Sequence, residues 1–236
     1  VKRLTDKKEI ERARIHPIKV LEALKTYSSG RSQKGSSTWT PVRSITDALD
    51  KAFYLAFKNV TPSGAKVLIG LDVSGSMDGG YYGYGEPSSA ILTPREATGA
   101  IALVTAATEP ETHVIGFTGG SNGGYGYGRK ASSAGNGKYG SVVTDLDNIV
   151  SPNRRLDDVI NDLKALPMGS TDCSLPMLYA LEKGLRPEAF IILTDNETYA
   201  GFIQPHEALA KYRRETGIDA KLVVLAVTPT RNSIVD

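Results

Sequence analysis

The sequence predicts a doubly wound α/β fold, with a mainly parallel sheet that has one antiparallel edge strand and follows a short α-helical segment. After Gly64, short apolar runs rich in β-branched residues alternate with amphipathic helical patterns. Most of these runs are continuously apolar, which is typical of strands covered by helices on both faces. The glycine-rich connection 119–140 leaves no room for a helix between two of the runs, which indicates one hairpin.

The apolar pattern of the first 59 residues predicts helices. Apolar side chains recur at helical spacing from Asp6 to Tyr27, with Pro17 as a break or as a first-turn residue of a second helix. A polar loop is expected over 28–38, and Pro41 opens another helical pattern, which ends near the "TPSG" stretch.

The apolar pattern after Gly64 predicts five strands and four helices. We expect strands over 66–72, 112–118, 141–146, 189–195 and 220–227. We expect helices over 94–107, 154–166, 174–185 and 205–216. The second and third strands flank the glycine-rich connection, so they are predicted to pair as an antiparallel hairpin at the edge of the sheet.

Composition narrows the class of protein. A chain of 236 residues that is 40% hydrophobic can form an α/β domain with an appendage. No apolar run approaches the roughly 20 residues that a membrane-spanning helix requires, so we expect no membrane partner. Cys173 is the single cysteine, which suits a reducing compartment, and the expected location is therefore cytoplasmic.

Charge is distributed unevenly along the chain. Residues 1–43 hold 11 Lys and Arg against 4 Asp and Glu, a net charge of +7, whereas the remainder holds 17 against 22, a net charge of −5. A basic end of this kind indicates either a polyanionic partner or a solvated helix face, and charge alone does not choose between them.

Polar side chains cluster where the predicted strands end. Asp72, Ser74 and Ser76 follow the first strand, Thr171 lies in the "GSTD" stretch before a helix, and Asp195 closes the fourth strand. The predicted topology places all of them at the carboxyl edge of the sheet, where open α/β sheets bind ligands. Each stretch alone is also typical of turns and helix caps, and only their order along the chain favours a shared site.

The chemistry of this set suits a hard divalent cation. Two carboxylates and three hydroxyls, without a paired histidine or cysteine, are ligands for Mg²⁺ or Mn²⁺. Asp72, Ser74, Ser76 and Thr171 are expected to bind the metal directly, and Asp195 directly or through water. Five protein oxygens leave one octahedral position open for an oxygen from a partner.

The pattern of Asp72, Ser74, Ser76, Thr171 and Asp195 resembles the metal-ion-dependent adhesion site (MIDAS) of von Willebrand factor A domains, which have a Rossmann-like fold. Longer stretches, among them "IHPIKVLEALKTYSSG", "GSTDCSLPM" and "FIILTDNETYAG", resemble the Ro ribonucleoprotein autoantigen family. In that family a TROVE module, a ring of helical repeats, is joined to such a domain.

The resemblance implies two parts and a binding role. Residues 1–59 would be the C-terminal end of the helical ring and residues 60–236 the A domain, so Val1 would begin inside the ring of a longer protein. The family implies binding of noncoding Y RNA and a role in RNA quality control. The metal would capture an acidic group of a protein or RNA partner. We expect a monomer without enzymatic activity, with candidate RNA phosphate contacts at Arg12, Arg14, Lys19 and Lys25.

Two Gly/Tyr-rich stretches, 79–89 and 119–140, are longer than the corresponding loops of the family and are expected to flank the metal. Their tyrosines could stack on nucleobases, or the stretches could be mobile linkers without a specific function.

The alternative function is a Mg²⁺-dependent phosphohydrolase that uses Asp72. Haloacid dehalogenase-type phosphatases place an aspartate after the first strand, but they need a second one two residues later, where this chain has Ser74. The glycine-rich stretches do not match the P-loop pattern. No motif links Cys173 to a histidine, which favours a buried thiol over a nucleophile.

Overall fold

The computed structural model describes residues 1–78, 91–119, 142–166, 169–195 and 203–227, which form two compact units. One unit comprises Val1–Ser63 with Gly85–Thr93, and its described elements are helical. The other comprises Gly64–Tyr84 with Pro94–Asp236 and contains the sheet. Within the described residues, no helix has the length and apolarity needed to cross a membrane.

The helical unit contains α1 (Lys7–Ala13), α2 (Pro17–Ser28) and α3 (Arg43–Leu55), with short 3₁₀ helices at Lys2–Thr5 and Ala56–Asn59. The Asp6 carboxylate caps α1 by accepting from the backbone N–H groups of its first turn. Pro17 occupies the first turn of α2, where its missing N–H removes no helical hydrogen bond.

The connection between α2 and α3 turns back on itself. Arg31 and Thr38 form an isolated antiparallel bridge, and the Trp39 indole N–H donates to the Tyr27 carbonyl at 2.8 Å. The expected polar loop is therefore folded against the end of α2.

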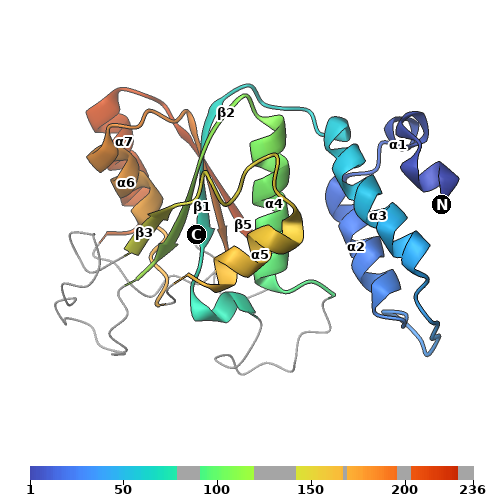
Figure 1. The fold of residues 1–236 in the computed structure, drawn as a ribbon. Helices are drawn as coiled ribbons and strands as arrows, with labels where there is room; N and C mark the ends of the chain where they lie inside the picture. The colour runs from blue at the N-terminus through green and yellow to red at the C-terminus, as the bar shows by residue number, and fades with distance from the viewer. Residues whose placement is uncertain (79–90, 120–141, 167–168, 196–202, 228–236) are drawn as a thin grey trace. The chain divides into compact units, whose positions relative to one another are not determined.

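The second unit is a five-stranded sheet in the order β3-β2-β1-β4-β5 (Figure 1). Neighbouring strands run parallel, except that β3 runs antiparallel to β2, with Ile115 paired to Asp145. The predicted doubly wound fold with one antiparallel edge strand is thus confirmed. The strands are β1 (Lys66–Asp72), β2 (Glu111–Thr118), β3 (Val142–Asp145), β4 (Ala189–Thr194) and β5 (Lys221–Ala226).

Helices cover both faces of this sheet. Figure 1 shows α4 (Pro94–Thr108) and α5 (Leu156–Lys164) on one face, with α6 (Leu175–Lys183) and α7 (Pro205–Thr216) on the other. Every residue of β1 after Lys66 is buried, as a central strand between two helical layers requires. At the edge, β5 departs from this pattern, because Val223 is 44% exposed.

The packing of α6 on β1 depends on a glycine. A Cβ atom at Gly70 would lie 2.7 Å from Cγ of Pro176, so only glycine allows this close approach. Pro176 lies in the first turn of α6. The contact therefore holds the start of α6 over the second half of β1, towards its carboxyl end.

Candidate metal centre

The candidate centre lies at the topological switch point of the sheet. The chain leaves β1 through α4 to reach β2 on one side, and later returns to β4 on the other side. The carboxyl ends of β1 and β4 therefore flank the crevice where doubly wound sheets bind ligands. Asp72 is the last residue of β1, and Asp195 directly follows β4. Both carboxylates are buried, at 2% and 5% exposed.

Two hydrogen bonds, one from the turn after β1 and one from β4, hold the Asp72 carboxylate. Its Oδ1 accepts from the Ser74 backbone N–H at 2.9 Å, and its Oδ2 accepts from the Thr194 hydroxyl at 2.8 Å. The hydroxyl oxygens of Ser74 and Ser76 lie 3.1 Å apart. The chain then forms the 3₁₀ helix Gly75–Asp78. Asp72, Ser74 and Ser76 thus belong to one hydrogen-bonded turn.

Burial makes a charge on Asp72 costly. The pKa of this carboxyl is raised to about 6, chiefly by desolvation and to a smaller extent by the charge of Asp195, against the lowering effect of the hydrogen bonds from Ser74 and Thr194. The Ser74 N–H and the Thr194 hydroxyl, which donate to Asp72, are both neutral. A divalent cation beside Asp72 would offset the desolvation cost, so the donor set fits Mg²⁺ or Mn²⁺.

The loop that contains Thr171 is held by the end of β2. The Ser170 carbonyl accepts from the Thr118 hydroxyl at 3.1 Å and from the Gly119 backbone N–H. A Cβ atom at Gly169 would overlap the Gly119 carbonyl oxygen, so the two backbones approach more closely than a side chain permits. Thr171 is 4% exposed in this loop.

A third buried carboxylate follows Thr171. Asp172 is 4% exposed, and its Oδ1 accepts from the Ser174 backbone N–H at 3.0 Å and from the Ser174 hydroxyl at 2.6 Å. Burial raises the pKa of Asp172, against these two hydrogen bonds. The "GSTD" pattern is typical of a helix cap, but these hydrogen bonds go to the N-cap residue Ser174 itself, and α6 has no side-chain cap hydrogen bond.

Arg95 is a buried cation that sequence analysis did not identify. Its side chain is 1% exposed, and its Nε lies 2.5 Å from an oxygen of Asp78. Its terminal nitrogen donates to the Ser74 carbonyl at 3.2 Å. Because Asp78 ends the 3₁₀ helix after the Asp72 turn, Arg95 connects the start of α4 to both ends of this segment. The sequence signal was weak, since an arginine in a helical first turn usually faces solvent.

The structure places the predicted metal ligands at one edge of the sheet. Asp72, Ser74 and Ser76 share a turn, Asp195 follows the neighbouring strand, and Thr171 lies in the loop held by β2. Their role as metal ligands stays a prediction. The Gly/Tyr-rich stretch 79–89, and its counterpart except for Gly119, lie outside the described residues.

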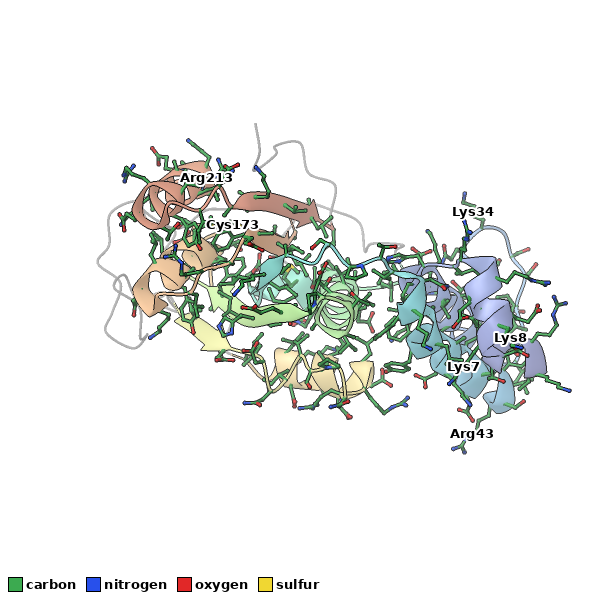
Figure 2. All side chains as sticks on the ribbon, turned by 90° about the horizontal axis from the view of Figure 1, so that it is seen from above. Lys7, Lys8, Lys34, Arg43, Cys173 and Arg213 are labelled. Carbon is green, nitrogen blue, oxygen red and sulfur yellow. The ribbon has the colours of Figure 1, made fainter. Side chains whose placement is uncertain are left out.

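The predicted RNA contacts lie on or beside α1 and α2. Arg12 pairs with Glu9 at 3.0 Å and Lys19 with Glu22 at 2.9 Å, so these two cations are partly neutralised. Arg14 is exposed just after α1, and Lys25 lies in the last turn of α2. Figure 2 shows further cations of this unit that sequence analysis did not name, at Lys7, Lys8, Lys34 and Arg43.

A doubly wound sheet with this strand order, with an Asp-x-Ser-x-Ser turn after β1 and an aspartate after β4, defines the class of von Willebrand factor A-type domains. Residues 66–236 match the profile described as the Ro60 vWA domain. The chain therefore belongs to the Ro60 vWA domain family.

Individual relatives agree with this assignment. The RNA-binding protein RO60 of Caenorhabditis elegans is 40% identical over 237 residues, which span all of this chain and 32% of the relative. The RNA-binding protein RO60 of Deinococcus radiodurans is 35% identical, over all of this chain and 39% of the relative. The crystal structure of the D. radiodurans RO (RSR) protein matches with a TM-score of 0.79 at 34% identity, over 99% of this chain and 41% of that chain. The chain thus spans about a third of the length of these curated relatives.

Proposed function

We propose that this chain is the metal-dependent binding part of a Ro-type RNA-binding protein. Asp72, Ser74, Ser76, Thr171 and Asp195 would hold Mg²⁺ or Mn²⁺, and the open coordination position would accept an acidic group of a protein or RNA partner. When bound, the cation supplies positive charge and that open position. The observation that carries the proposal is the buried Asp72 carboxylate, whose pKa is raised to about 6 among neutral donors.

The arrangement favours binding over hydrolysis. Both oxygens of Asp72 accept hydrogen bonds, from the Ser74 N–H and from the Thr194 hydroxyl, which orient the carboxylate as a fixed ligand. At the position where a phosphatase of the haloacid dehalogenase type needs an acid and base, the chain has Ser74. The phosphohydrolase alternative therefore lacks a group for proton transfer at that position.

The test is metal-dependent thermal stabilisation of the chain and of an Asp72→Asn variant. Asparagine keeps an acceptor for the Ser74 N–H, and its amide N–H can donate to the Thr194 hydroxyl oxygen, but it removes the charge. Mg²⁺ or Mn²⁺ should therefore raise the melting temperature of the parent and not of the variant. Asp158→Ala, an exposed aspartate of α5, should keep the full rise. Equal stabilisation of Asp72→Asn would refute the assigned site. Metal-dependent release of phosphate from a generic ester by the parent, lost in Asp72→Asn, would instead support the phosphohydrolase.

RNA binding is the second part of the proposal, because the two curated relatives are named RNA-binding proteins. The whole protein would bind noncoding Y RNA and act in RNA quality control in the cytoplasm. In this chain the contacts would be phosphate contacts from the helical unit, at Arg12, Arg14, Lys19 and Lys25 and at the exposed Lys7, Lys8, Lys34 and Arg43.

The salt dependence of binding to a short single-stranded RNA tests this part. The affinity should fall steeply between about 50 and 200 mM salt and should not change in Asp72→Asn. An RNA affinity that does not change with salt concentration, or no binding at all, would contradict an RNA contact surface on the helical unit.

A further inference from the structure

We propose that His113, Asp145 and Asp147 form a second metal site, for a divalent cation of the Zn²⁺ class, on the β2–β3 hairpin. Each residue offers one ligand atom, and these atoms all lie within 4.8 Å of one another. The set shares no residue with the centre at Asp72, and it contains an imidazole nitrogen as well as carboxylate oxygens.

The antiparallel hairpin brings the three residues together. His113 lies in β2 on the same face as Ile115, because side chains two residues apart in a strand share a face. Ile115 pairs with Asp145, the last residue of β3, so Asp145 lies on that face as well. Asp147 lies two residues after Asp145, and its side chain contacts β2. Its Oδ1 accepts from the Val114 backbone N–H at 2.7 Å.

Backbone amides orient both carboxylates. The Val114 N–H holds one oxygen of Asp147, and the Asp147 N–H donates to Oδ1 of Asp145 at 2.9 Å. The second oxygen of Asp147 lies 2.6 Å from Nδ1 of His113. Outer contacts that fix ligand orientation in this way are typical of metal sites, because they reduce the reorganisation that binding requires.

The imidazole presents Nδ1 to the carboxylates. The His113 ring stacks on Tyr179, with ring centroids 6.0 Å apart and an interplanar angle of 7°. Its Nε2 is buried and has no hydrogen-bond partner among the described residues. The ring therefore makes its polar contact through Nδ1, which lies beside Asp147.

Within the described part of the chain, the negative charge of this set has no partner from Lys or Arg. Among the described residues, no lysine or arginine forms an ion pair with Asp145 or Asp147. A divalent cation that replaces the proton between His113 and Asp147 would balance both carboxylates, and that proton would pass to solvent.

The donor types select the kind of metal. One imidazole nitrogen with two carboxylate oxygens suits Zn²⁺ or Co²⁺, whereas Mg²⁺ prefers oxygen ligands alone. Three protein ligands leave a position for water. The cation should therefore differ from the one proposed at Asp72.

Titration of the metal-free chain with Co²⁺ tests the proposal, in an Asp72→Asn background that removes the other site. We expect visible absorption bands of Co²⁺ that saturate at one equivalent, vanish on addition of Zn²⁺ and persist in excess Mg²⁺. His113→Gln should abolish the bands and weaken Zn²⁺ binding by about tenfold or more. His206→Gln, at an exposed histidine of α7, should leave both unchanged.

A second variant, Asp145→Asn, distinguishes the loss of a metal ligand from a folding defect in His113→Gln. Asp145→Asn keeps the side-chain shape, and it should also weaken Zn²⁺ binding while circular dichroism in EDTA reports an intact fold. Absence of Co²⁺ bands in the Asp72→Asn background would overturn the proposal, and so would bands that survive in both His113→Gln and Asp145→Asn. Because every sample carries Asp72→Asn, failure here would not bear on the centre at Asp72.

Discussion

The two groups of acidic residues in the α/β unit differ in burial. At the carboxyl edge of β1 and β4, the carboxylates of Asp72 and Asp195 are almost completely buried. On the β2–β3 hairpin, the side chain of Asp147 is 43% exposed and that of His113 is 23% exposed. Water stabilises charge on the hairpin, whereas at the carboxyl edge the protein must supply that stabilisation.

The difference in burial determines how strongly the charge of each group is coupled to folding. Desolvation raises the pKa of Asp72 to about 6, so the folded protein bears the cost of that charge. A cation at either site should stabilise the fold by its own binding free energy, but only at the carboxyl edge should it also offset the desolvation of a buried carboxylate.

Arg95→Met should lower the free energy of unfolding most, by about 3–4 kcal/mol, because it removes a buried cation from its pair with the partly exposed Asp78 and leaves the Ser74 carbonyl without one of its donors. Urea denaturation followed by circular dichroism measures the loss. Arg154→Met, which removes a surface pair with Asp162, is the matched control and should cost about 0–1 kcal/mol.

The same arginine variant should also weaken Mn²⁺ binding at the carboxyl edge, since Arg95 holds the turn that contains the proposed ligands. Calorimetric titration of the folded variant measures this affinity. If Arg95→Met kept the parent's Mn²⁺ affinity, Arg95 would stabilise the fold without positioning the turn. Equal costs of Arg95→Met and Arg154→Met would show that burial does not separate the two pairs.

Stability should fall as the pH rises from about 4 to about 6 in the metal-free chain. The folded pKa of Asp72 is raised from 3.8 to about 6, so stabilisation by the protonated carboxyl is fully present below the unfolded pKa. It is lost as the pH rises through the folded pKa, and the difference corresponds to about 3 kcal/mol. Unfolding free energies measured in EDTA at several pH values give the slope.

Asp72→Asn should remove this contribution from the pH profile, because the amide does not titrate. Saturating Mg²⁺ should oppose the decline in the parent, since the cation stabilises the ionised carboxylate. An identical slope in the parent and in Asp72→Asn would show that Asp72 does not dominate the pH dependence, and it would weaken the comparison between the two groups.

Much of the fold could be predicted because local patterns mark its elements. The bounds of β1 and α7 were predicted to the residue, since the apolar run 66–72 ends at an aspartate, Pro205 begins the helix and Gly217 follows its end. Helix α5 is shorter than the predicted 154–166, because Arg155 is its N-cap and the helix ends at Lys164. Local composition does not show where the hydrogen bonds at a helix end stop.

The candidate centre was only partly predictable. Asp72 and Asp195 follow apolar strands, and the topology places them at one edge. Arg95 could not be predicted, because its burial depends on Asp78 and on the Ser74 carbonyl, which are brought near it by tertiary folding. His113 and Asp147 are 34 residues apart in sequence, and their contact exists only once the hairpin has formed.

The smallest effect is expected on the hairpin. In EDTA, His113→Gln should lower the free energy of unfolding by about 1 kcal/mol or less, because His113 and Asp147 form a partly exposed pair and glutamine keeps a polar side chain there. Urea denaturation measures the loss, with His206→Gln as the control for an exposed histidine. A loss as large as that of Arg95→Met would show that the hairpin residues serve the fold itself. A small loss, together with loss of Co²⁺ binding, would identify them as a surface site that folding does not require.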